Sequence, residues 1–213
     1  MSPHSTNPTT STGCTLCQPA ALEQLLRSHP QASAHWQSLP RVQLAGAQIL
    51  LRTGEAVGHC WWIEQGLLRS YYLDPHGVES NRAFHGAGDW VGHGLPPVDA
   101  ISEHYLEALE PSTLVEMSYA TLRALLAQYP ALQALLNEAH TSLLAAQSRR
   151  EASLLGHTPA QRYQAFRASH AHLQDRIPLH HVARYLGISN VSLSRIRARL
   201  GLLTKNTGAR PTG

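Results

Sequence analysis

The chain has 213 residues, of which 43% are hydrophobic, and this supports one large core or two modest ones. Residues 158–213 carry nine Lys and Arg against one Asp, a net charge of +8, whereas residues 1–157 carry eight basic and thirteen acidic side chains, a net charge of −5. This asymmetry indicates a polyanionic partner for the C-terminal part. No apolar stretch approaches the roughly 18 residues of a membrane span, and no segment resembles a signal peptide. We therefore expect a cytoplasmic protein with no membrane partner.

The N-terminal half begins with polar sequence and continues with a β-rich region. Residues 1–18 are predicted to form a disordered tail, because Ser, Thr and Pro dominate them and they have no helical or strand pattern. A short helical stretch follows around residues 19–29. Between residues 41 and 117, turn signals recur about every 8–12 residues between β-rich runs, which predicts a small sandwich or jelly-roll barrel. These turns include Thr53-Gly54-Glu55, Asp74-Pro75-His76-Gly77 and Gly86-Ala87-Gly88-Asp89.

Helical spacing replaces the β pattern after residue 119. Residues 120–128 are predicted to form one helix, and Pro130 starts a second that runs to about Leu155. Leu135 and Leu144 lie off the main apolar line of this second helix and could face the barrel. A core helix packed only within its own chain would show similar leucines, but the regular line favours a dimerisation helix. Its residues alternate in steps of three and four, as in a coiled-coil seam: Leu132, Leu136, Ala139, Leu143 and Ala146.

The sequence of the C-terminal part predicts a helix, a turn at a glycine and a second, basic helix. Thr158 and Pro159 provide the N-cap and first position of the helix that opens this part. Gly187 supplies the positive φ of a sharp interhelical turn, and Ser189 is a favourable N-cap for the next helix. Apolar residues form one stripe on each helix of the pair, which predicts a helix-turn-helix. These stripes are Leu179, Val182, Ala183 and Leu186 on the first helix, and Leu193, Ile196 and Leu200 on the second.

The outward face of the second helix is suited to DNA. At about 100° per residue, small and polar side chains with one arginine point away from the apolar stripe, and such a face can approach base edges in the major groove. We expect Asn190, Val191, Ser194 and Arg195 to read bases. The alternative without DNA binding is an ordinary αα-hairpin with a solvated basic face. The expected phosphate contacts are His180, Ser189, Ser192, Arg197 and Arg199, with His181 also near phosphates on the outward face of its helix.

The order of these parts resembles the Crp/Fnr superfamily of bacterial transcription regulators over roughly residues 40–200. The resemblance implies a homodimer on double-stranded promoter DNA, with RNA polymerase as a further partner. It also implies that Asn190, Val191 and Arg195 read bases and that Ser192 contacts phosphate. Better-known members carry arginine and glutamate where Asn190 and Val191 stand, so the operator should differ. The segments that carry the resemblance are Gln65-Gly66, Gly88-Asp89-Trp90-Val91-Gly92, Thr158-Pro159-Ala160-Gln161-Arg162-Tyr163, Tyr185-Leu186-Gly187-Ile188-Ser189 and Ser192-Leu193-Ser194-Arg195-Ile196.

The fold class predicted from these observations is α+β. We expect a tail at 1–18, a β-jelly-roll sensor domain resembling cyclic-nucleotide-binding domains, with flanking helices, at 19–128, and a dimerisation helix at 129–156. A helix-turn-helix domain is expected at 157–203, followed by a flexible tail at 204–213. Family members usually continue into a β-hairpin wing, but residues 201–213 are too short and too rich in glycine for one.

The resemblance also implies what a sensor ligand would need. In members that bind cyclic nucleotides, a Gly-Glu pair is followed by an arginine that pairs with the phosphate. Here His93 replaces the glutamate, and no arginine lies between Arg82 and Arg123. Because a buried phosphate without a cation is costly, we expect neither cyclic AMP nor cyclic GMP. Arg69 and Arg82, with His93, are the remaining pocket candidates for another anion.

The cysteines and histidines leave other chemistries open. Cys14, Cys17 and Cys60 could hold an iron–sulfur cluster only if a histidine such as His59 completed the four ligands. A thiol–disulfide switch at Cys14 and Cys17 is a second possibility. Haem is a third, although no spacing points to it, and the prediction remains that the chain has no cofactor.

A different class of function is a cupin-like metal enzyme. Such a site needs a His-x-His pair, a glutamate and a later histidine, whereas this chain offers His59, Glu64, His85 and His93 without that spacing. We therefore expect a regulator and no enzyme. A regulator that has lost sensing, and binds DNA constitutively as a dimer, is a third interpretation.

Overall fold

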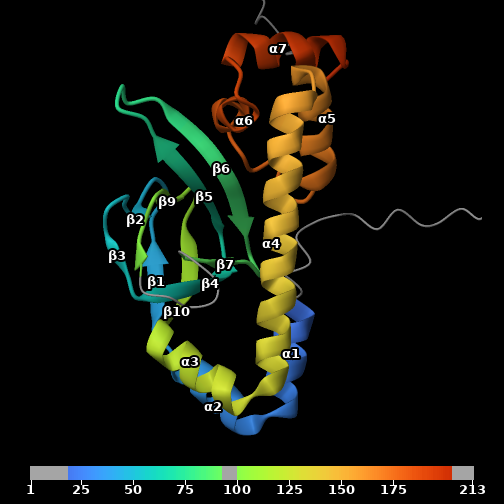
Figure 1. Ribbon diagram of the computed structural model, residues 1–213. Coiled ribbons are helices and arrows are strands. Elements are labelled where there is room, and N and C mark those ends of the chain that lie inside the picture. The colour runs from blue at the N-terminus through green and yellow to red at the C-terminus, as the bar shows by residue number, and fades with distance from the viewer. Residues whose placement is uncertain (1–18, 93–99, 203–213) are drawn as a thin grey trace, which may run out of the picture.

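The computed structural model describes residues 19–92 and 100–202 and shows a mixed α+β chain with a β-barrel beside one long helix (Figure 1). This confirms the predicted fold class. The described elements are α1 (Pro19–Ser28), α2 (Pro30–Ser38), β1 (Arg41–Leu44), β2 (Ile49–Leu51), β3 (Ala56–Val57), β4 (His59–Gln65), β5 (Leu67–Leu73), β6 (Glu79–Gly86), β7 (Trp90–Val91), β8 (Ala100–Ile101), β9 (Tyr105–Ala108), β10 (Ser112–Ser118), α3 (Tyr119–Gln128), α4 (Pro130–Gly156), α5 (Pro159–Ser169), α6 (Leu179–Leu186) and α7 (Asn190–Arg199).

Antiparallel strands build the barrel from two four-stranded sheets and a two-stranded pair. The sheets have the orders β1-β10-β4-β7 and β2-β9-β5-β6, and β3 pairs with β8. The side chains between the sheets form a buried apolar core that includes Ile63, Leu68, Leu106 and Leu114. Among the described strands, β6 pairs with β5 alone in the second sheet, so its other edge is open to contacts with the helices.

A glycine at the β4–β5 turn is required by close backbone packing. Gly66 has φ +116°, and a Cβ at this position would lie 2.7 Å from the Cα of Ser112. A side chain would therefore meet both backbone strain and a clash with β10. Gly66 belongs to one of the segments that carry the family resemblance, and its role is structural.

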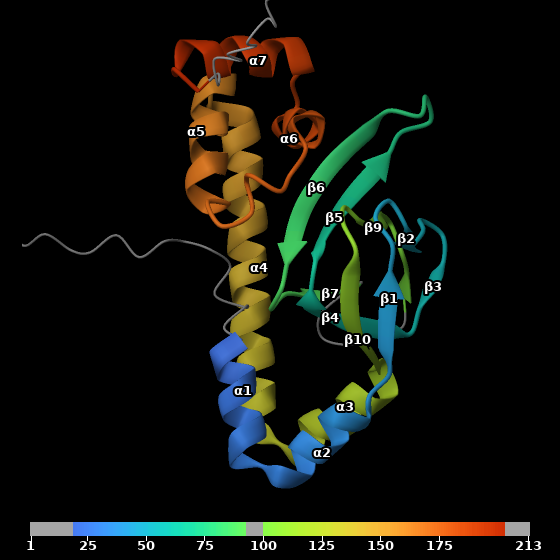
Figure 2. The same ribbon diagram turned by 180° about the vertical axis from the view of Figure 1, so that it is seen from behind.

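The helices at the N-terminal side close one end of the barrel. Figure 2 shows α1 alongside the lower half of α4, with α2 and α3 under the barrel. α4 has 27 residues, which gives a length of about 40 Å. Leu132, expected in a dimer seam, packs against the barrel core of its own chain. Leu144, which we expected could face the barrel, is instead 54% exposed.

The three C-terminal helices share a second core with the outer face of the barrel. Leu67 and Phe84 come from the barrel strands, and Tyr163, Phe166 and further residues of α5–α7 complete the cluster. Figure 1 shows α6 between the barrel and α4, with α7 across the top of the molecule. The helix-turn-helix is therefore packed against the barrel and not held by α4 alone.

Local signals at the helix ends have the predicted structure. Thr158 forms a capping box with Gln161, and Pro159 is the first residue of α5. Gly187 ends α6 with φ 66°, and the hydroxyl of Ser189 accepts from the backbone N–H of Ser192 at the start of α7. The apolar stripes are shorter than expected, because Leu179 is 46% exposed and Leu200 is also exposed. Within the described ranges, no helix combines the length and apolar character needed to cross a bilayer.

Replacement of Gly66 by alanine should destabilise the barrel. We expect Gly66→Ala to lower the free energy of unfolding by about 2–6 kcal/mol, because strain at positive φ and overpacking each cost about 1–3 kcal/mol. Urea denaturation at neutral pH measures this loss. Gly58→Ala is the matched control, since a Cβ at Gly58 would meet no heavy atom within 4 Å. Equal losses in the two variants would show that the contact with Ser112 does not limit this turn.

Candidate nucleic-acid interface

The solvent side of α7 presents the residues predicted to read bases. Asn190, Val191, Ser194 and Arg195 are all exposed, and Val191 has 60% of its surface free. On the opposite side of α7, the side chains of Leu193 and Ile196 are buried in the second core and hold the helix in place.

The predicted phosphate-binding residues divide into three groups. His180 and Arg199 are exposed near the two ends of the helix pair. The hydroxyls of Ser189 and Ser192 lie 3.0 Å apart at the start of α7. Arg197 is turned inward, where its guanidinium donates to the hydroxyl of Tyr163 at 3.3 Å and to the carbonyl of Leu202 at 3.2 Å. It therefore braces the helix-turn-helix and, in this arrangement, does not face a DNA backbone.

His181 does not lie on the outward face of α6 as expected. Its side chain is 7% exposed. Its backbone carbonyl accepts from the side-chain N–H of Asn81 on β6 at 2.8 Å. Burial, and then the positive charge of Arg69, lower the pKa of His181 to about 3. The ring is therefore neutral at physiological pH. The sequence did not reveal this, because α6 has a second buried side that packs on the barrel.

Charged groups link α6 and the α5–α6 connection to the barrel. Glu79 on β6 accepts from Arg69 and from Arg184 of α6, each at 2.5 Å. Burial alone would raise the pKa of Glu79, but the hydrogen bond and charge of Arg69 and the charge of Arg184 outweigh it and lower that pKa. Arg176 pairs with Glu110 and donates to the carbonyl of Gly66 at 2.9 Å. These contacts fix the orientation of the helix-turn-helix relative to the barrel.

Arg69 is part of this link and not of a ligand pocket. Its side chain is 3% exposed and donates to Glu79, to Asn81 at 2.9 Å and to Glu107 at 2.7 Å. Strand alternation puts it on the same side of β5 as Leu67, which belongs to the second core, and opposite Leu68 of the barrel core. Its charge is already matched by two carboxylates, so the expectation that it meets a ligand in the barrel is wrong.

The other pocket candidates are less defined. Arg82 is half-buried on β6, and His93 lies outside the described residues. On the inner side of the same sheet, His85 Nε2 and Ser70 Oγ lie 3.2 Å apart within hydrogen-bonding distance. Burial, followed by the charge of Arg82, lowers the pKa of His85 to about 3. The barrel interior therefore holds a neutral polar pair that sequence reasoning did not single out.

Three comparisons with known proteins show what the chain is similar to in sequence and in fold. Residues 41–129 match the family described as the cyclic nucleotide-binding domain. The Fumarate and nitrate reduction regulatory protein of Vibrio cholerae is 29% identical over 131 residues, which are 57% of this chain and 50% of that protein. Regulatory protein HlyX of Actinobacillus pleuropneumoniae is 26% identical over 217 residues, with 91% of this chain and 88% of that protein covered. The structure of FixK2 from Bradyrhizobium japonicum has the same fold, with a TM-score of 0.68 at 18% identity over 81% of this chain and 90% of that one.

These matches show that the chain is similar to a cyclic nucleotide-binding domain over residues 41–129 and to named regulatory proteins in sequence, and that it has the fold of FixK2. They agree with the family resemblance seen in the sequence. The relatives found by sequence are named as regulatory proteins, and the chain spans half the length of the Vibrio relative and most of the length of HlyX.

The described thiol of this chain is not arranged for metal binding. Cys60 is buried in the barrel core, and its Sγ lies 3.6 Å from the carbonyl of Met117. Burial raises the pKa of Cys60 to about 12, so the thiol is protonated at neutral pH. His59 is exposed, and as its neighbour on β4 it lies on the opposite face, so it does not complete a ligand set with Cys60. Cys14 and Cys17 lie outside the described residues.

The histidines and glutamate considered for a cupin-like site do not converge. His59 and Glu64 are exposed on β4, whereas His85 lies within hydrogen-bonding distance of Ser70 on the inner side of β5. Among residues 19–92 and 100–202, no group of three or more His, Cys, Asp or Glu side chains could hold a metal ion.

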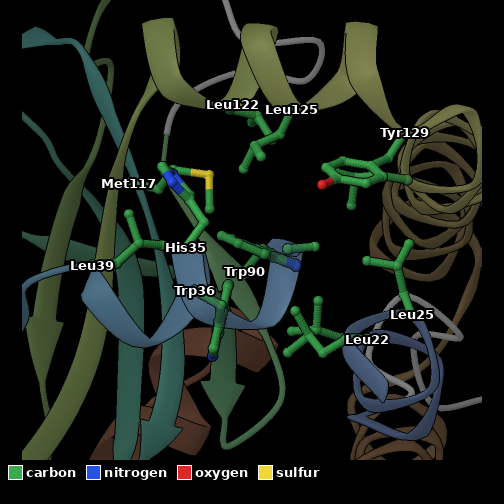
Figure 3. Close-up of a pocket in the computed structure, with 13 residues that line it drawn as sticks. Leu22, Leu25, His35, Trp36, Leu39, Trp90, Met117, Leu122, Leu125 and Tyr129 are labelled. Carbon is green, nitrogen blue, oxygen red and sulfur yellow. The ribbon is translucent and has the colours of Figure 1, made fainter. Parts of the chain in front are cut away.

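Sequence reasoning missed an apolar pocket between the N-terminal helices and the barrel. Figure 3 shows Leu22 and Leu25 of α1, Trp36 of α2 and Leu122 of α3 around this space, with the hydroxyl-bearing ring of Tyr129 at its side. Trp90 and Met117 form the wall toward the barrel. The indole rings of Trp36 and Trp90 pack edge to face at 5.9 Å. The helically spaced leucines of residues 19–29 were the available signal, but their partners are distant in sequence.

Acid should destabilise this protein through its buried neutral histidines. The pKa of His181 is about 3 in the folded state and its ordinary value is 6.5. The unfolded state therefore takes up the proton first as pH falls. The contribution of His181 to the free energy of unfolding is fully present above about pH 6.5. It is lost as pH falls toward the folded pKa, and the loss at pH 5 is about 2 kcal/mol. Urea denaturation at pH 7.5 and pH 5 measures the loss.

A pair of neighbouring variants isolates this histidine. His181→Gln should lose less stability than the wild type between the two pH values, because its side chain no longer titrates. His180→Gln, at the exposed neighbour, should behave like the wild type. The interpretation fails if His180→Gln alters the acid response as much as His181→Gln does.

Proposed function

We propose that this chain is a sequence-specific DNA-binding transcription regulator that acts as a homodimer. The observation that carries the proposal is the α7 surface. It combines exposed polar and small side chains with Arg195, and it stands on a helix whose other side is buried and whose start is capped. A face of this kind approaches base edges closely, and the arginine can pair bidentately with a guanine.

Base reading is assigned to Asn190, Val191, Ser194 and Arg195. Val191 suits contact with a thymine methyl group, and Ser194 is small enough to let α7 enter the groove. His180, Ser189, Ser192 and Arg199 are assigned to phosphates, where they would fix the register of the protein on the duplex. The net charge of +8 on residues 158–213 supports a polyanionic partner.

The dimer is proposed to form along α4. Leu136, Leu143 and Ala146 are half-buried in the single chain and share one side of this helix. Two subunits related by a twofold axis would present two α7 helices to successive major-groove turns. RNA polymerase is proposed as a further partner from the family resemblance, and the cytoplasm of a bacterium as the place of action.

The barrel is proposed to serve a ligand other than a cyclic nucleotide, or none. No arginine lies between Arg82 and Arg123, and Arg69 is engaged by Glu79 and Glu107. No enzymatic activity is proposed, because the sequence relatives are named as regulators.

Arg195 should be required for sequence preference. After selection of a preferred duplex from random DNA, we expect Arg195→Ala to weaken binding to that duplex by about 1–3 kcal/mol and to relax the preference at one base pair. Fluorescence anisotropy at fixed salt, on the selected and on a random duplex, measures both effects. Arg199→Ala is the contrasting variant and should weaken both duplexes alike. Equal losses on both duplexes for Arg195→Ala would remove it from base reading.

A charge placed in the proposed seam should separate the subunits. We expect Leu143→Lys to sediment as a monomer at a concentration where the wild type is a dimer, because an ammonium group would be buried without a partner. Leu144→Lys is the matched control on the adjacent, more exposed position and should remain dimeric. Circular dichroism verifies that both variants are folded. Dissociation of Leu144→Lys alone would place the interface on the other side of α4.

A further inference from the structure

One arginine of the long helix contacts both the barrel and the helix-turn-helix. Arg150, in the last two turns of α4, donates from Nη1 to the backbone carbonyl of Tyr185 at 3.0 Å and from Nη2 to the backbone carbonyl of Asn81 at 2.9 Å. Its guanidinium carbon also lies 4.0 Å from the centre of the Tyr185 ring. A single side chain therefore joins α4, α6 and β6.

Both acceptors are backbone groups that regular secondary structure leaves available. Tyr185 lies in the last turn of α6, where carbonyls have no partner within the helix. Asn81 is on β6, which pairs with a strand on one side only within residues 19–92 and 100–202. A cation is also favourable at a helix C-terminus because it faces the negative end of the helix dipole. The two hydrogen bonds of Arg150 thus hold the main chains of α6 and β6 together and do not depend on which side chains stand at Tyr185 and Asn81.

The ring under the guanidinium belongs to an aromatic cluster. Tyr185 lies 5.5 Å from Phe84 of β6 and 5.4 Å from Phe166 of α5, measured between ring centres. The flat guanidinium packs on one face of Tyr185 while its two ends bond to carbonyls. A planar guanidinium can make these two hydrogen bonds and the ring contact at the same time. The ammonium of a lysine cannot, since it is a compact group on a flexible chain.

We propose that Arg150 is a positioning residue for DNA binding, which fixes the α6–α7 pair against β6 from the dimerisation helix. This inference rests on the proposed function. A shift of α4 relative to the barrel must either carry α6 with it or break one of the two hydrogen bonds. The distance between the two α7 helices of a dimer is therefore set in part by this side chain, although it touches no base or phosphate itself.

The first test needs no DNA. Hydrogen exchange of the full-length protein, followed by mass spectrometry, compares the wild type with Arg150→Gln, Arg150→Lys and Arg149→Gln. We expect amides of α6 and β6 to exchange about tenfold faster or more in Arg150→Gln, because charge-assisted hydrogen bonds are among the stronger ones. Amides of β4 and β10 in the barrel core should keep their wild-type rates. Arg149→Gln, at the exposed neighbouring position, should match the wild type throughout.

The second test reads the position of α7 on DNA. Selected half-sites are placed at several spacings, and a single half-site serves as the reference duplex. We expect Arg150→Gln to lose about tenfold in affinity at the preferred spacing, with a flatter dependence on spacing, while its binding to the single half-site stays as in the wild type. Arg150→Lys should follow Arg150→Gln, because it keeps the charge and loses the fork.

The outcomes separate this inference from the proposed function. A wild type that binds no duplex ends the proposed function, and the exchange measurement then still decides whether Arg150 holds α6 to β6. Unchanged exchange in Arg150→Gln overturns the inference, as does wild-type behaviour of Arg150→Lys in both tests. An equal loss of Arg150→Gln on the spaced and single half-sites also overturns it, because positioning would then play no part.

Discussion

The buried contact between β6 and α6 determines how the two halves of this molecule are related. Arg69 of β5 is buried beside this contact and donates to Glu79, Asn81 and Glu107, while the more exposed Arg184 of α6 also pairs with Glu79. Buried charges are tolerated only when they are paired in good geometry. The apolar residues of the second core would allow several ways of packing the helices on the barrel, whereas these directional contacts favour one. The proposed DNA-binding surface therefore has a defined orientation, because β6 supplies the carboxylate of Glu79 and the amide of Asn81 at the right positions.

The sequence predicted the features that depend on local chemistry. The fold class, the order of the elements, the glycine turn at Gly187, the cap at Ser189 and the start of α5 at Pro159 follow from interactions within a few residues, and the structure has each of them. The exposed face of α7 was also predictable, because one helix with one buried stripe leaves the opposite side to solvent. Whether its residues read bases stays a prediction.

Long-range packing decided the features that the sequence could not give. His181 was placed outward because its helix has one obvious apolar stripe, but the barrel covers a second side of α6. Arg69 was a candidate for the pocket. The sequence could not show which side of β5 it occupies, because that depends on sheet register and on the second core. Arg197 had the spacing of a phosphate contact. Only the position of Tyr163 on another helix shows that the guanidinium of Arg197 bonds within the helix-turn-helix domain. Leu132 similarly finds its partners in the barrel core.

The open edge of β6 carries a consequence for solubility. Edge strands with unsatisfied backbone groups are templates for pairing with other chains, and proteins protect them with covering helices or charged groups. Here α6 packs against β6, and Arg150 occupies a carbonyl of the strand. Any state in which the helices swing away uncovers this strand together with the apolar side chains of Leu67 and Phe84. Such an open state should aggregate readily. A protein whose α6–α7 pair moved freely away from β6 would therefore be less soluble than one in which the pair stays packed.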